Sequence, residues 1–85
     1  MKIYWDGKSK NIIGEKIKQL RKQRNLTQKQ LAEKLQLEGH EFSDLTILRI
    51  EQGNRFVPDY EVVILANFFK ITTDKLLIDN LKTDS

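Results

Sequence analysis

Residues 26–53, LTQKQLAEKLQLEGHEFSDLTILRIEQG, contain the pattern that decides the fold. The hydroxyl of Thr27 can cap the start of a helix. The apolar positions that follow it recur at helical spacing: Leu31, Ala32 and Leu35. Gly39 and its neighbours break this pattern, and Ser43 can cap a further helix, about Asp44–Gln52, that ends at Gly53. The sequence therefore predicts two short helices joined by a turn, over about residues 27–53.

Three further helices are predicted around these two. One begins at about Asn11 and ends near Arg24, with apolar side chains on one face. Another begins at Pro58 or Asp59 and is apolar as far as about Phe69. A last short helix extends to about residue 78. Because no strand-like alternation occurs, the predicted fold class is all-α, a compact five-helix domain at residues 11–79, preceded by an N-terminal arm at 1–10 and followed by a frayed tail at 80–85.

Composition narrows the function classes. The 85 residues suffice for one domain, and their net charge is +3. The charge is uneven, because residues 1–35 carry ten Lys and Arg against three acidic side chains, whereas the rest carries five against nine. One basic side suits a polyanionic partner. Solvated helix faces are also often rich in lysine, so charge alone does not choose between the two interpretations.

The residues that several kinds of catalytic, metal-binding and membrane function require are absent from the sequence. The chain has no cysteine, which excludes disulfides, thiol catalysis and thiolate metal sites. The chain has a single histidine, His40, and no cysteine that could bind a metal together with it. A protein metal site needs three or four ligands. There is no phosphate-binding glycine loop and no apolar run near the ~20 residues that span a bilayer. We therefore expect a cytoplasmic protein that is not an enzyme, with no metal, no cofactor and no membrane partner.

Three ordered segments resemble a known family. Ile13–Lys22, Leu26–Ala32 and Ile47–Gly53 closely resemble the lambda-repressor-like (Cro/XRE-type) helix-turn-helix family, and Val62–Leu77 is similar to its last two helices. The resemblance covers about residues 11–78. The chain departs from it in the turn, where Gln36–Phe42 is longer than the commonest tight turn and is similar to a long-turn variant of the family. We expect Phe42 to pack into the core there.

The resemblance implies that the helix at about residues 44–52 lies in the major groove of DNA. It places four side chains at base-facing positions: Asp44, Leu45, Leu48 and Arg49. Arg49 suits the O6/N7 edge of guanine, with a solvated charge or a phosphate contact as the alternative. Asp44 can accept from cytosine N4, and the leucines can meet thymine methyl groups or, alternatively, a protein partner.

Other positions are implied to hold the DNA backbone or the scaffold. The phosphate-contacting set is Gln28, Lys29, Ser43, Asn54 and Arg55. For Ser43, a role as a helix cap is an equal alternative. Arg21 and Glu51 match a structural ion pair that joins the first helix to the end of the helix at about residues 44–52.

The apolar surplus on the helix at about residues 58–69 leaves two interpretations open. Ile64 and Phe68 lie off the inward stripe, so they either widen the core stripe or form a homodimer contact, which we favour. Tyr4 and Trp5 have no assigned place; core packing, a dimer strand and a DNA-contacting arm all remain open.

The predicted function is a repressor-like regulator that reads a palindromic operator in double-stranded DNA. The alternative is a protein-interaction module or antitoxin on the same fold.

Overall fold

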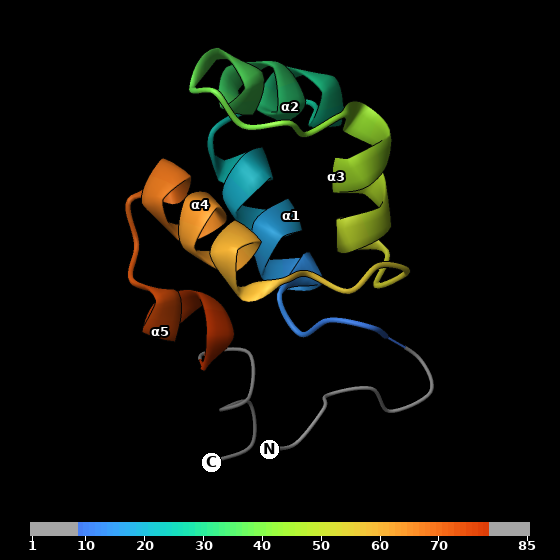
Figure 1. Ribbon diagram of the computed structural model, residues 1–85, viewed down its shortest axis with the longest axis vertical. Coiled ribbons are helices and arrows are strands. Elements are labelled where there is room, and N and C mark those ends of the chain that lie inside the picture. Colours follow the sequence, from blue (N-terminus) through green and yellow to red (C-terminus); the bar gives the residue numbers. More distant parts are fainter. Residues whose placement is uncertain (1–8, 79–85) are drawn as a thin grey trace.

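The computed structural model describes residues 9–78 of the chain, as five helices with no strand in that range. In order these are α1 (Gly14–Gln23), α2 (Gln28–Leu37), α3 (Asp44–Glu51), α4 (Asp59–Phe69) and α5 (Thr73–Leu77). Figure 1 shows α1 between α3 on one side and α4 on the other, with α2 across one end and α5 near the opposite end. The all-α prediction is confirmed.

Side-chain caps fix where the helices begin. Thr27 Oγ1 accepts from the Gln30 amide at 3.0 Å, and Gln30 Oε1 accepts from the Thr27 amide at 2.9 Å, which makes a reciprocal capping box for α2. Ser43 Oγ accepts from the Thr46 amide at 3.1 Å and starts α3. Thr72 caps α5 in the same way. These hydrogen bonds satisfy amides that the first turn of a helix leaves without partners.

Two helix boundaries differ from the prediction. The first helix begins at Gly14 and not at Asn11, because the Asn11 carboxamide oxygen accepts from the amides of Ile13 and Gly14 at 3.1 and 2.8 Å. Asn11 thus caps the helix from outside it. The second helix continues to Leu37, beyond the last buried position of the apolar pattern, and Gly39 follows with φ of +92°.

One apolar core joins the helices. The largest fully buried side chains come from every helix and from the segment before α1: Ile13, Ile17, Leu31, Leu35, Ile47, Ile50, Leu65 and Leu76. Phe42, in the long turn between α2 and α3, is 3% exposed and packs in this core, as predicted. The long turn is therefore anchored at its second half, immediately before α3.

The exposed face of α4 is not the one that the sequence indicated. Ile64 and Phe68 are half-buried and pack against the core, so the wider core stripe describes them better than an open contact face. Tyr60 and Val63 are exposed instead, at 63% and 46%. The helix is apolar on most of its surface, which is why its pattern did not identify the outward side.

The last residue of the predicted arm, Lys10, lies against the turn that follows α3. The Lys10 amide donates to the carbonyl of Gly53 at 2.7 Å. Tyr4, Trp5 and the tail from residue 80 lie outside the described residues. Over residues 9–78, no helix is both long enough and apolar enough to span a bilayer.

Candidate nucleic-acid interface

Helix α3 presents an open face to solvent at one side of the molecule (Figure 1). Asp44, Leu45 and Arg49 are exposed on it, and Leu48 is half-buried. Eight residues make a helix of about 12 Å. This length and the uncovered outer face suit a helix that enters the major groove of B-DNA, which is about 12 Å wide.

The charged groups on this face differ in how far they are already hydrogen-bonded within the protein. The Asp44 carboxylate accepts from the Leu45 amide at 2.8 Å, so it is partly used by the first turn of its own helix. Arg49, in the last turn, makes no side-chain hydrogen bond or ion pair with any residue in 9–78. Its five guanidinium N–H groups are therefore open to an external acceptor.

A buried polar network anchors the C-terminal end of α3. The Nε and Nη2 atoms of Arg21 donate to the two oxygens of Glu51 at 2.7 and 3.1 Å. Arg21 Nη1 also donates to the carbonyl of Leu26 at 2.8 Å. Both charged residues are buried, and this is the ion pair that the sequence suggested. The pair joins α1 to α3 and thereby fixes the position of the face that carries Arg49.

Gln28 joins the same network from the first turn of α2. Its Nε2 donates to Glu51 Oε1 at 3.0 Å. Because an ionised carboxylate only accepts hydrogen bonds, the amide must present its NH2 group to Glu51. The second N–H of that group stays available as a donor. The network thus holds an N–H donor that can bind a phosphate at the N-terminus of α2, beside the exposed Lys29.

Two other predicted phosphate contacts lie near the ends of α3. Ser43 is exposed before the first turn, where its hydroxyl caps the helix and lies 3.0 Å from the Thr46 hydroxyl. Asn54 is exposed after the last turn, and its Nδ2 donates to Gln52 Oε1 at 3.2 Å. Both keep hydrogen-bonding capacity toward solvent.

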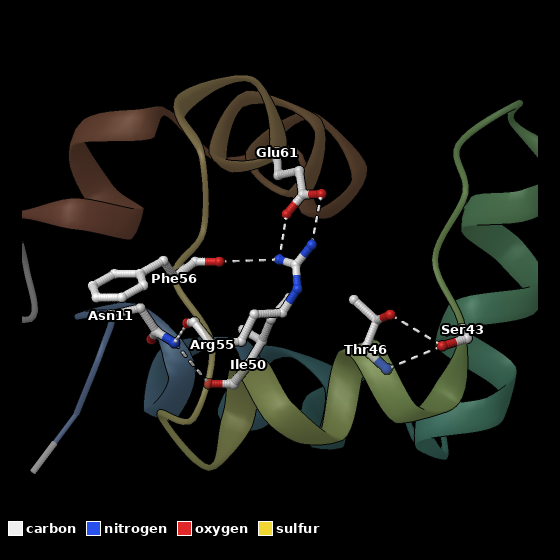
Figure 2. A network of polar contacts seen from close by, with 7 residues as sticks. All are labelled: Asn11, Ser43, Thr46, Ile50, Arg55, Phe56 and Glu61. Carbon is white, nitrogen blue, oxygen red and sulfur yellow. Dashed lines mark hydrogen bonds and ion pairs between the residues drawn. The ribbon is translucent and has the colours of Figure 1, made fainter.

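Arg55, also predicted to contact phosphate, uses part of its donor capacity within the protein. Its two terminal nitrogens face Glu61, at 2.6 and 3.1 Å, and Nη1 also donates to the carbonyl of Phe56 (Figure 2). The hydrogen bonds that Arg55 donates to Glu61 raise the pKa of Arg55 above its ordinary value, against a smaller opposing effect of burial. Arg55 therefore joins the loop after α3 to α4, with much of its charge offset.

Asn11 and Glu61 are the structural residues that sequence reasoning missed. The Nδ2 of Asn11 donates to the carbonyls of Ile50 and Arg55 at 3.1 and 2.9 Å, while its oxygen caps α1 (Figure 2). Glu61 is buried in the first turn of α4, where its pair with Arg55 compensates its charge. Sequence reasoning used Asn11 only as the approximate start of the first helix, and it assigned no role to Glu61.

A comparison with known protein families agrees with this geometry. The family described as a helix-turn-helix domain matches this chain over residues 14–80, which includes all five helices. No curated protein matches it, and no solved structure does.

Proposed function

The chain belongs to the helix-turn-helix domain family and is a DNA-binding domain, and from this premise we propose that it is a repressor-like transcription regulator. In this proposal α3 lies in the major groove, and a homodimer reads a palindromic operator. Arg49 reads a base edge, while Gln28, Lys29, Ser43 and Asn54 contact phosphates. Phosphate contacts set the register of the protein on the duplex and carry no sequence information.

The observation that carries the proposal is the contrast between two charged residues of α3, Glu51 inside the polar network and Arg49 outside it. Glu51 is buried and satisfied by Arg21 and Gln28, whereas Arg49, two residues earlier on α3, is exposed with no partner among residues 9–78. A rigid helix thus presents an unpaired guanidinium, with the Gln28 donor held at the neighbouring helix. This arrangement suits simultaneous base and phosphate contact.

The dimer is supported by the outer face of α4. Tyr60 and Val63 lie three residues apart and therefore on the same side of the helix, and both are exposed. Ile64 and Phe68, half-buried, would contribute only their outer edges. A two-fold pair would place two α3 helices on half-sites about 34 Å apart.

Selection of bound sequences from a random duplex pool tests this function. We expect a two-fold symmetric consensus with two half-sites. A consensus without symmetry would overturn the palindromic dimer, and recovery of random sequence would overturn base reading altogether.

Two substitutions separate base reading from phosphate contact. We expect Arg49→Ala to relax base preference at one position in each half-site, with a loss of about 1–3 kcal/mol there. Gln28→Ala should weaken binding to all duplexes alike, because phosphates are the same in every sequence. Lys18→Ala, an exposed change on α1, is the matched control. An unchanged consensus with Arg49→Ala would remove this residue from the base-reading set.

A second candidate function is favoured by one observation. Leu45 is 48% exposed on the outer face of α3, next to the acidic Asp44. An exposed apolar side chain beside an acid also suits a protein partner, as in an antitoxin or interaction module. Leu45→Ser distinguishes the two, since a DNA reader keeps its phosphate-driven affinity whereas a protein contact at α3 would be lost.

A further inference from the structure

The C-terminal ends of α1, α2 and α4 meet around a groove of about 460 Å³, which we call the helix-end groove. Its apolar lining is Leu26, Leu37 and Phe68, and its basic lining is Arg24, Lys34 and Lys70. Figure 1 shows the C-terminal end of α4 at the left and α3 at the right. The groove therefore lies away from the face that we assign to DNA.

The apolar lining is unusually open at one point. Leu37, the last residue of α2, is 87% exposed, more than any other large apolar side chain in residues 9–78. Leu26 and Phe68 pack partly against the core. Phe68 also meets Phe69 edge to face, with ring centroids 5.0 Å apart. The floor is thus fixed, while Leu37 stands at its edge with apolar surface that nothing in the described chain covers.

Arg24 forms a fixed wall of the groove. Its Nη1 and Nη2 atoms donate to the carbonyls of Phe68 and Phe69 at 3.3 and 2.9 Å, at the end of α4. The guanidinium carbon also lies 5.6 and 5.2 Å from the centres of the Phe68 and Phe69 rings. These contacts use two donors on helix carbonyls and leave the positive charge without a carboxylate.

The other two cations, Lys34 and Lys70, form no ion pair with any residue in 9–78. Within residues 9–78 the ion pairs join Arg21 to Glu51 and Arg55 to Glu61, so neither Lys34 nor Lys70 is in one. Lys70 also has a positive φ, at +59°. Glu38 is the single acidic lining residue. The groove thus combines an apolar floor with an excess of two positive charges.

From this combination we propose that the helix-end groove docks an acidic peptide segment of another protein, which inserts an apolar side chain between Leu37 and Phe68. Carboxylates flanking that side chain lie near Lys34 and Lys70. Duplex DNA fits less well, because its base faces are stacked inside the duplex and its backbone has no apolar side chain to insert between Leu37 and Phe68. The proposal does not depend on DNA binding by α3.

The test uses the full chain and a fluorescein-labelled peptide, Glu-Asp-Leu-Asp-Glu-Leu-Phe-Asp, followed by fluorescence anisotropy. We expect saturable binding with a Kd below ~1 mM. A peptide with serine in place of the apolar residues, and one with lysine in place of the acids, should both bind at least about tenfold more weakly. Absence of binding by the first peptide up to ~1 mM overturns the proposal.

Matched variants locate the site. Lys34→Glu combined with Lys70→Glu, and separately Leu37→Ser, should each weaken peptide binding at least about tenfold. The control is Lys18→Glu with Lys75→Glu, which makes the same change in charge at exposed positions outside the groove. Leu37 is exposed, so its substitution should leave the unfolding temperature unchanged. An equal loss in the control pair means non-specific charge attraction and overturns the proposal.

Two further readouts distinguish other occupants. Unlabelled duplex DNA should not displace the peptide from the wild-type protein at moderate salt. If DNA does displace it, and this effect is lost in the Lys34→Glu, Lys70→Glu variant, the groove binds nucleic acid. Sedimentation should give the same oligomeric state for wild type and Leu37→Ser. A change in that state would assign the groove to a second copy of this chain. Either result overturns the proposal of a peptide partner.

Discussion

Replacing Glu51 by alanine is expected to lower the free energy of unfolding by about 3–5 kcal/mol. The carboxylate accepts two hydrogen bonds from Arg21 and one from Gln28, and both charged residues are buried. Removal of the acid leaves the Arg21 guanidinium buried with a carbonyl of Leu26 as its remaining partner. A domain of this size has about 5–15 kcal/mol of stability in total, so the loss would be a large share of it.

Urea unfolding measures this effect. The matched control is Glu38→Ala, because Glu38 is an exposed acid that is in neither ion pair of residues 9–78, and it should change stability by less than about 0.5 kcal/mol. The double variant Arg21→Met with Glu51→Leu should regain much of the loss, since it buries apolar groups in place of an unpaired charge. A Glu51→Ala protein as stable as the Glu38→Ala control would contradict the anchoring role of the network.

Substitution of Gly14 by alanine is the second large effect, with an expected loss of about 1–3 kcal/mol. A Cβ atom there would lie 2.4 Å from the Ile50 carbonyl oxygen, 3.1 Å from that of Glu51 and 3.2 Å from Asn11 Oδ1. Two of these neighbours are backbone atoms at the end of α3, so relief requires α3 to move away from α1. Alanine's better helix propensity, about 1 kcal/mol over glycine, offsets only part of this cost.

Thermal unfolding measures the change, and each kcal/mol should lower Tm by roughly 4–8 °C in a domain of this size. Gly39→Ala is the control, because its φ of +92° adds backbone strain while no atom lies within 4 Å of a new Cβ. Its cost should stay near the ~1–2 kcal/mol of a left-handed residue, and DNA affinity should not change. Gly14→Ala should also weaken DNA binding, through displacement of α3. Wild-type stability and affinity in Gly14→Ala would refute the close contact.

Local signals in the sequence predicted the helices well. Thr27, Ser43 and Thr72 cap α2, α3 and α5 because a hydroxyl acts on amides within three residues of itself, which is information that a short window contains. Asn25, directly after the predicted end of the first helix near Arg24, has φ of +57°, a left-handed conformation that asparagine adopts more readily than most residues. The packing of Phe42 into the core was predicted from the resemblance and from its apolar side chain in an otherwise polar turn.

The contacts that the sequence did not reveal join segments distant in the chain. Asn11 reaches carbonyls at Ile50 and Arg55, and the close approach of Gly14 to Ile50 exists only once α1 and α3 have packed. Arg55 was expected to contact phosphate, but a partner on the next helix takes its terminal nitrogens. On α4 the apolar pattern was too broad to show which face is open. These are properties of tertiary packing, which residue type and spacing do not determine.

Fluorescence anisotropy of a labelled mixed-sequence duplex tests the central claim, that the α2–α3 face binds double-stranded DNA. We predict saturable binding at about 50 mM salt that weakens at least a hundredfold by about 200 mM, because phosphate contacts release counterions. Arg49→Ala and Gln28→Ala should both bind more weakly at the lower salt, whereas Lys34→Glu with Lys70→Glu in the helix-end groove should bind within about threefold of wild type. No binding at about 50 mM salt with ~100 μM protein would contradict the claim.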